Sequence, residues 1–177
     1  MSETQGQVED HVDLLIHAGW VVPVVPEGTV LSCASIAISG GRIRAILPRD
    51  EAASLRADTV VNLPGHVVLP GLINSHTHAA MNLFRGLADD LSLMDWLENH
   101  IWPAETRWVS EDFVHSGTEL AIAEMIRGGT TCFNDMYFFP DQAAQAAIQM
   151  GIRAVVGMIL IEQPTPWAGT IDEYFDK

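Results

Sequence analysis

Basic residues are scarce in this sequence of 177 residues. Nine Lys and Arg stand against 23 Asp and Glu, which gives a formal net charge of −14. A protein that binds nucleic acid neutralises phosphates with clustered basic side chains, and the sequence has no such cluster. The same shortage disfavours an anionic membrane surface. We therefore expect neither nucleic acid nor a membrane as a partner.

Long hydrophobic runs and cysteines are also few. No uncharged apolar run approaches the ~18 residues of a membrane span. The polar, acidic start lacks the basic and apolar regions of a signal peptide. Cys33 and Cys132 lie far apart and form no CxxC pair, which argues against a disulfide framework. We expect two reduced thiols in a cytoplasmic protein.

The residues that are present predict a globular protein in more than one part. Hydrophobic residues make up 48% of the chain and the mean hydropathy is +0.17, enough for a good core. We interpret residues 1–11 as a disordered tail. Residues 12–66 alternate short apolar runs with turn signals at 39–41 and 64–65, which predicts a small β unit.

From residue 67 to residue 177 strands and helices alternate. Apolar segments that end near 73, 138 and 161 indicate strands, and the last of these predicts a strand buried on both faces. Capping patterns predict helices that begin after Ser92, Ser110 and Thr170, and a further helix over 141–150. This order is the parallel βα repeat of an α/β protein. Because three strands do not close a barrel, we expect an incomplete fold.

Two histidines follow the first of these strands. Side chains at positions i and i+2 of a strand point to the same side, so His76 and His78 should present both imidazoles in one direction. Paired neutral imidazoles suit a divalent cation, most commonly Zn²⁺. The pair also lies at the C-terminal end of a predicted parallel strand, where α/β barrels carry their chemistry. The sequence therefore predicts a metal site at His76 and His78.

At this point the sequence resembles a known family. The segment "LPGLINSHTHAAMNLFRGLADDLSLMDWL" is similar to the amidohydrolase superfamily. Within it, the likeness is greatest to the deaminases of 5′-methylthioadenosine and S-adenosylhomocysteine, of the triazine-hydrolase and cytosine-deaminase-like branch. This more specific resemblance lies in the segments "MNLFRGLADDLSLMDWL", "IWPAE" and "NDMYF".

The resemblance implies a fold and a set of metal ligands. The fold would be a (β/α)8 TIM barrel of which residues 67–177 form the first three βα units. Residues 12–66 would be the N-terminal share of a small β-sandwich. His76 and His78 would be the first two ligands. The remaining ligands and the proton-shuttle glutamate are expected beyond Lys177, so we predict no catalytic residue within this chain and a need for the remainder of the barrel.

The resemblance also implies substrate contacts. Glu105, in "IWPAE", would accept hydrogen bonds from the ribose hydroxyls of a nucleoside, and Trp96 would pack against the substrate. Asn82 and Arg85 would line or brace the mouth of the site. Met158 stands near the place where some relatives carry an arginine for the substrate carboxylate, which favours methylthioadenosine over adenosylhomocysteine.

Together these features predict a zinc-dependent hydrolytic deaminase. It would convert the adenine amine of 5′-methylthioadenosine or S-adenosylhomocysteine to the inosine-type product and release ammonia. We expect one Zn²⁺ per subunit, with Fe²⁺ or Mn²⁺ as other candidates, and a homo-oligomer, either a dimer or a tetramer. Two alternatives stay open: another amidohydrolase, such as a guanine or cytosine deaminase or a triazine chlorohydrolase, and a non-catalytic fragment that acts only as a scaffold.

Overall fold

The structure is a computed structural model, and it describes residues 11–177. The chain divides between Pro70 and Gly71 into two compact units, whereas the sequence pattern predicts the boundary after residue 66. The predicted tail lies outside the described residues except for His11. That residue is the first of a strand, where it pairs with Arg56 and its side chain lies 3.0 Å from Asp58. The tail prediction is therefore wrong at His11.

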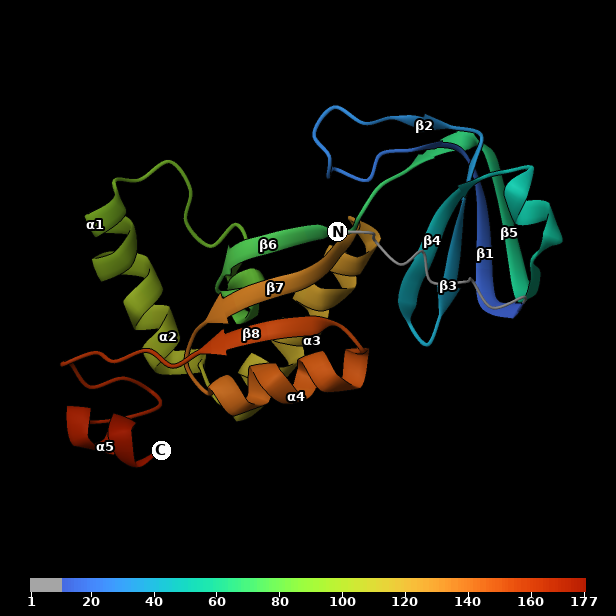
Figure 1. Cartoon of the computed structure of the whole chain (residues 1–177). Coiled ribbons are helices and arrows are strands. Elements are labelled where there is room, and N and C mark those ends of the chain that lie inside the picture. The colour runs from blue at the N-terminus through green and yellow to red at the C-terminus, as the bar shows by residue number, and fades with distance from the viewer. Residues whose placement is uncertain (1–10) are drawn as a thin grey trace. The chain divides into compact units, whose positions relative to one another are not determined.

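The first unit is a five-stranded sheet organised around its first strand (Figure 1). Strand β1 (His11–Val21) pairs antiparallel with β2 (Leu31–Ser32) and with β3 (Ala34–Ser39). It also pairs in parallel with β5 (Arg56–Val68), while β4 (Arg42–Pro48) pairs antiparallel with β3. Apolar side chains on both faces of β1 and β3 are buried, so the unit has its own small core.

Two predicted turns in this unit have different outcomes. Gly40 and Gly41 join β3 to β4 with φ values of +59° and +69°, so the hairpin turn is confirmed. The turn predicted at Pro64 and Gly65 is wrong, because both residues lie inside β5. The β1–β5 register shifts there, and a Cβ at Gly19 would lie 2.3 Å from the Pro64 carbonyl oxygen. The Pro-Gly pair therefore marks a bulge. A short 3-10 helix over Glu51–Ser54 precedes β5.

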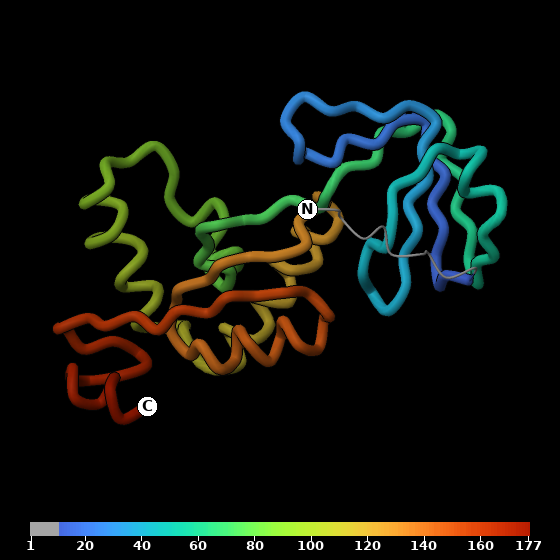
Figure 2. Tube along the Cα trace, in the orientation of Figure 1, coloured from blue at the N-terminus to red at the C-terminus, as the bar shows by residue number. Residues whose placement is uncertain are grey.

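The second unit is a three-stranded parallel sheet with helices on one face. The strands β6 (Leu72–Thr77), β7 (Thr130–Met136) and β8 (Arg153–Gly157) run side by side in that order (Figure 2). Helices α3 (Glu111–Arg127) and α4 (Pro140–Met150) pack on each other and under the sheet. Because the strands are parallel, their C-terminal ends share one edge, and the α/β prediction is confirmed.

Capping residues set the helix ends as the sequence predicts. The Ser110 hydroxyl accepts a hydrogen bond from the Phe113 amide at 3.2 Å and starts α3, which ends at Gly128. Helix α4 ends at Gly151 in the left-handed region, with φ of +71°. Thr170 accepts the amide of Glu173 and starts α5, whose bounds are Ile171–Asp176.

A longer helical segment connects β6 to α3. Directly after β6 comes a 3-10 helix, η2 (Ala79–Phe84), which packs on α3. The helices α1 (Leu93–Trp96) and α2 (Trp102–Trp108) follow, joined by a π-helical turn over Leu97–Ile101. The Ser92 hydroxyl accepts the Asp95 amide, which confirms the predicted helix start.

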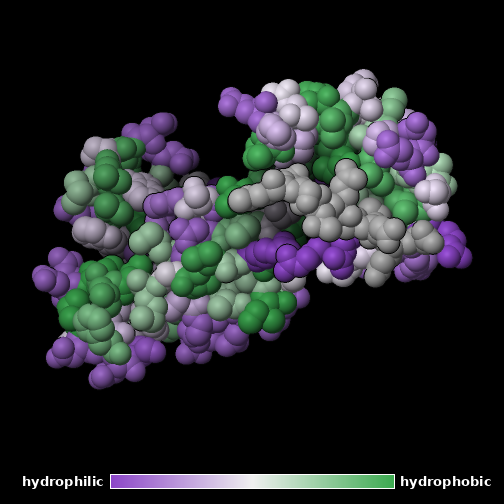
Figure 3. All heavy atoms as spheres, viewed as in Figure 1, coloured by the Kyte–Doolittle hydropathy of each residue, from purple (hydrophilic) through white to green (hydrophobic). Residues whose placement is uncertain are grey.

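The third strand differs from its prediction. The sequence predicts a strand over 152–161 that is buried on both faces, but β8 ends at Gly157 and Val155 is 61% exposed. The physical reason is that, within residues 11–177, helices cover one face of this sheet: Ala154 packs on the core on that face, and Val155 points to the other. At the other edge, Ile73 of β6 is 71% exposed. Figure 3 shows hydrophobic residues at the surface of this unit among more hydrophilic ones.

The structure also bears on the cysteines and on the lack of long hydrophobic runs. Cys33 and Cys132 are both free, as predicted. Within residues 11–177, no helix is both long enough and apolar enough to cross a membrane.

Candidate functional site

The two histidines lie where the first parallel strand ends. His76 belongs to β6, and His78 is the first residue after it. Their ring centroids are 5.1 Å apart and the ring planes meet at 79°. The i, i+2 spacing therefore brings the two imidazoles next to each other at the edge of the sheet.

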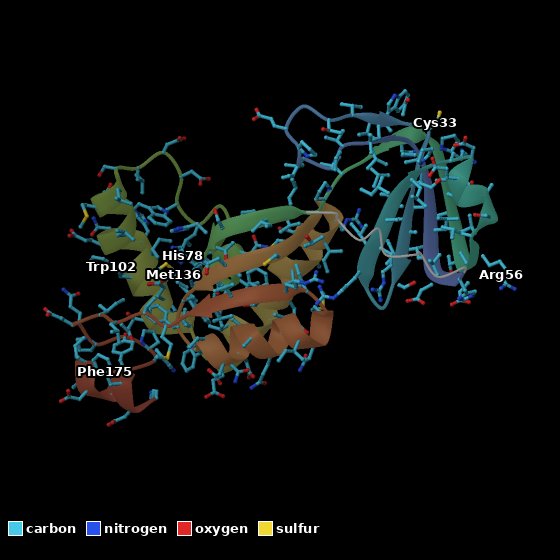
Figure 4. All side chains as sticks on the ribbon, in the orientation of Figure 1. Cys33, Arg56, His78, Trp102, Met136 and Phe175 are labelled. Atoms are coloured by element: carbon cyan, nitrogen blue, oxygen red, sulfur yellow. The ribbon has the colours of Figure 1, made fainter. Side chains whose placement is uncertain are left out.

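The next strand fixes the orientation of His78. The His78 Nδ1 atom lies 2.6 Å from the carbonyl oxygen of Met136, the last residue of β7. Figure 4 shows these two labelled residues together at the ends of their strands. A carbonyl only accepts hydrogen bonds, so Nδ1 carries a proton, and in the neutral imidazole Nε2 has the free lone pair. A histidine held this way is prepared to bind a metal through Nε2.

A buried carboxylate holds the backbone on both sides of His78. Asp135 is 1% exposed, and its Oδ1 accepts a hydrogen bond from the Thr77 hydroxyl at 2.6 Å and from the Ala79 amide at 2.7 Å. Burial raises the pKa of the Asp135 carboxyl, and these two hydrogen bonds oppose that rise. The contacts of Asp135 tie β7 to the two neighbours of His78.

A second buried carboxylate lies nearby. Glu105 of α2 is 8% exposed, and its Oε1 accepts a hydrogen bond from the Tyr137 hydroxyl at 2.7 Å. Burial raises the pKa of the Glu105 carboxyl, and the hydrogen bond from Tyr137 opposes that rise. Burial and the neighbouring Glu105 raise the pKa of the Tyr137 phenol strongly, so the phenol keeps its proton and acts as the donor.

One cavity brings several of the predicted residues together. It has a volume of about 230 Å³, and His78, Trp96 and Glu105 all contribute to its wall. The rest of the lining is mostly apolar or aromatic, and comprises Met81, Leu97, Ile101, Trp102, Met136, Tyr137, Phe138, Ile159 and Ile161. A mostly apolar wall with a few polar groups is typical of small-molecule sites. Met158 instead lines a different cavity, beside Trp167.

Asn82 and Arg85 brace the segment that follows the histidines. Arg85 donates to both carboxylate oxygens of Glu124 on α3, at 3.0 and 2.5 Å, and Asn82 donates to the same group at 3.0 Å. These hydrogen bonds, chiefly that from Arg85, lower the pKa of Glu124 from 4.5 to about 2. Close packing adds to the brace, because a Cβ at Gly117 would lie 2.6 Å from the Ala80 carbonyl oxygen. The network ties η2 to α3.

The donor set fits part of a zinc site. His76 and His78 supply two adjacent imidazoles, and Nε2 of His78 is free to coordinate. Across residues 11–177, no group of three or more His, Cys, Asp or Glu side chains is arranged to hold a metal ion. Among these residues, the two histidines therefore supply only part of a zinc ligand set.

Sequence reasoning did not identify Tyr137 or the carbonyl of Met136 as parts of this site. Both stand in "NDMYF", a segment used only for its family likeness. A polar aromatic residue directly after a buried parallel strand was the available signal, because such positions face the same edge as the histidines. The Met136 carbonyl carries no sequence signal, since any residue supplies one.

Comparisons with known proteins identify the family of this chain. The profile of the Amidohydrolase family matches residues 67–176. A 5-methylthioadenosine/S-adenosylhomocysteine deaminase of Saccharophagus degradans is 48% identical over 166 residues, which cover 93% of this chain and 37% of that protein. A 5'-deoxyadenosine deaminase of Methanosarcina mazei is 47% identical over 150 residues, 85% of this chain and 34% of its own length.

A solved structure is similar in both fold and sequence. The crystal structure of an adenosine deaminase from Xanthomonas campestris with bound zinc has a TM-score of 0.91 and 50% identity, and the match covers 94% of this chain and 38% of that one. The chain thus spans less than two fifths of the length of each of these relatives. Since the family profile covers more than half of the sequence, the chain belongs to the amidohydrolase family.

Proposed function

We propose that this chain forms part of a zinc-dependent deaminase of 5′-substituted adenosines. Its substrates would be 5′-methylthioadenosine, S-adenosylhomocysteine or both, and water would replace the amine on the adenine ring with release of ammonia. The names of the relatives support this class, because they include deaminases of methylthioadenosine, adenosylhomocysteine and 5'-deoxyadenosine. In this proposal His76 and His78 bind the metal, and Glu105 and Trp96 bind the nucleoside.

The observation that carries the proposal is the wall shared by His78 and Glu105. Both contribute to one largely apolar cavity, so a ligand held there meets a potential metal ligand and a carboxylate at once. Only one oxygen of Glu105 has a protein hydrogen bond within residues 11–177. A carboxylate accepts several hydrogen bonds, so this group can still receive two adjacent ribose hydroxyls.

Each of the site residues has a distinct role in the proposed reaction. Glu105 holds the ribose, and thereby fixes where the adenine ring lies relative to His78. Trp96 and the apolar wall exclude water from the base and offer a flat surface to it. The Met136 carbonyl keeps the proton of His78 on Nδ1 and so leaves Nε2 for the metal. Zinc, when bound, supplies a water that ionises near neutral pH.

The same proposal includes the parts of the fold that extend beyond this chain. The strands β6 to β8 would be the first three strands of a (β/α)8 barrel, and the sheet β1 to β5 the N-terminal share of a β-sandwich. The proton-shuttle glutamate and the other metal ligands would come from the remainder of the barrel. We also propose a cytoplasmic homo-oligomer, with Zn²⁺ preferred over Fe²⁺ and Mn²⁺.

The ribose contact separates this function from its alternatives. Free guanine, free cytosine and triazines carry no vicinal diol, so Glu105 would have no comparable partner in enzymes that act on them. A scaffold would need no buried carboxylate in an apolar cavity, because such burial costs free energy without a ligand. The arrangement around Glu105 therefore favours the nucleoside.

The test compares two enzymes on two substrates. We call "the completed enzyme" this chain joined to the remaining length of the Saccharophagus degradans relative. Kinetics are measured for this protein and for its Glu105→Ala variant, on 5′-methylthioadenosine and on its 2′,3′-dideoxy analogue. A hydrogen bond to a charged group contributes roughly 1.5–3 kcal/mol, so the variant should lose about ten- to a hundredfold in kcat/KM on the nucleoside.

The analogue supplies the control for this prediction. It has no diol to lose, so the variant should turn it over almost as well as the unsubstituted enzyme does. Equal losses on both substrates would mean that Glu105 does not recognise the ribose. The substrate class would then lack its structural support.

A further inference from the structure

We propose that Tyr137 is a positioning residue that holds the Glu105 carboxylate where a ribose diol meets it. The inference rests on the proposed function, in which Glu105 binds that diol. Tyr137 is 5% exposed and directly follows β7, the middle strand of the parallel sheet. Its hydroxyl donates to Glu105 Oε1 at 2.7 Å.

The end of β7 contacts both parts of the site through consecutive residues. The carbonyl of Met136 binds Nδ1 of His78, and the side chain of Tyr137 binds Glu105. β7 pairs with β6 on one side and β8 on the other, so its backbone is held from both directions. Met136 and Tyr137 together therefore set the position of the Glu105 carboxylate relative to His78.

Glu105 needs such an anchor because its own helix is short and lies outside the sheet. It belongs to the seven-residue helix α2, which follows a π-helical turn and is not part of the sheet. Within residues 11–177, Tyr137 is the only group that donates a hydrogen bond to the Glu105 side chain. Without that bond, the carboxylate would be free to rotate in the cavity and would meet the diol less often.

The Tyr137 hydroxyl contacts Glu105 and the Tyr137 ring makes the packing contacts, so one substitution can remove the hydrogen bond and keep the packing. The Tyr137 ring packs on Phe138 with centroids 4.9 Å apart, and it lies 6.2 Å from the ring of His78. Phenylalanine would keep these apolar contacts. Tyr137→Phe therefore removes the anchor and little else.

The experiment is a double-mutant cycle on the completed enzyme. Tyr137→Phe, Glu105→Ala and the double variant are each measured on 5′-methylthioadenosine and on its 2′,3′-dideoxy analogue. We expect Tyr137→Phe to lower kcat/KM on the nucleoside roughly tenfold, mostly through KM, and to change it less than about twofold on the analogue. In the Glu105→Ala background, adding Tyr137→Phe should cause no further loss, because its effect passes through Glu105.

Two measurements without turnover accompany the cycle. Zinc content should be the same in Tyr137→Phe as in the unsubstituted enzyme. The dissociation constant of methylthioadenosine for the zinc-free protein should rise about tenfold, like KM. A matched control is Tyr174→Phe, since Tyr174 is fully buried in the same unit and its hydroxyl lies 2.7 Å from that of Thr165. This variant should leave the ratio of the two substrates unchanged.

Several outcomes would overturn the proposal. Equal losses on nucleoside and analogue, independent losses from the two substitutions, or a fall in zinc content would each mean that Tyr137 does not act through Glu105. If Glu105→Ala discriminates the substrates but Tyr137→Phe changes nothing, only the role of the tyrosine is wrong. If the completed enzyme deaminates neither substrate, the proposed function fails and this inference fails with it.

Discussion

The substitution Asp135→Ala tests how firmly the sheet holds the predicted metal ligands. In the structure, Asp135 accepts hydrogen bonds from Thr77 and from the amide of Ala79, the two neighbours of His78. Alanine removes the single acceptor of both hydrogen bonds, Oδ1, from a position that is almost completely buried. The backbone that carries His78 would then be held less tightly.

The size of the effect follows from which donors lose their partner. The Thr77 hydroxyl can still donate to the carbonyl of Asn134, 3.1 Å away. Within residues 11–177 the buried amide of Ala79 has no second acceptor, and an unsatisfied buried donor costs about 1–3 kcal/mol. Burial disfavours the charged form of the Asp135 carboxyl, so removing this group offsets part of that cost. We therefore expect the free energy of unfolding to fall by about 1–2 kcal/mol.

The assay measures stability and zinc affinity in the completed enzyme. Urea denaturation gives the free energy of unfolding, and competition with a chelator gives the affinity for zinc. We expect zinc affinity to fall about tenfold, as is typical when groups that orient a metal ligand are removed. Asp135→Asn is the control, because its amide oxygen can still accept from Ala79. Unchanged stability and zinc affinity in Asp135→Ala would refute the reasoning.

Three further predictions concern the ligands, the brace and the open sheet. In the completed enzyme, His76→Ala and His78→Ala should each bind far less zinc by elemental analysis, and full zinc content in both would remove the metal assignment. Glu124 has a lowered pKa, so its stabilising effect should be present above about pH 4.5 and disappear toward pH 2. Glu124→Gln should therefore destabilise the completed enzyme at pH 7 but progressively less at pH 4 and pH 3, whereas a constant difference would contradict the ion pair. The 177-residue chain alone should aggregate in light-scattering measurements, since Ile73 and Val155 are exposed on open strands, and a monodisperse, cooperatively melting monomer would disprove this.

The sequence predicted local structure well where the signal is local. Capping serines and threonines, paired glycines and the alternation of apolar segments depend on neighbours within a few residues. For this reason the starts after Ser110 and Thr170, the hairpin at Gly40 and the α/β order are confirmed. The spacing of His76 and His78 likewise predicted adjacent rings, because the two residues lie two positions apart where the strand ends.

Predictions that depend on distant partners were less successful. The pair Pro64 and Gly65 predicts a turn, but pairing with β1 turns it into a bulge within β5. Val155 lies in an apolar run, yet its burial depends on what covers β8 rather than on the run itself. The bond from Tyr137 to Glu105 joins residues 32 positions apart, and no local pattern predicts such a contact.

The most direct test of the central proposal is the release of ammonia by the completed enzyme loaded with zinc. Initial rates are measured on 5′-methylthioadenosine, AMP and free adenine at equal concentrations. The proposal predicts rapid release from methylthioadenosine and poor release from the other two. AMP adds a charged phosphate that a chain of net charge −14 disfavours, and adenine lacks the diol that Glu105 would bind. Release from adenine that equals or exceeds release from methylthioadenosine would contradict it.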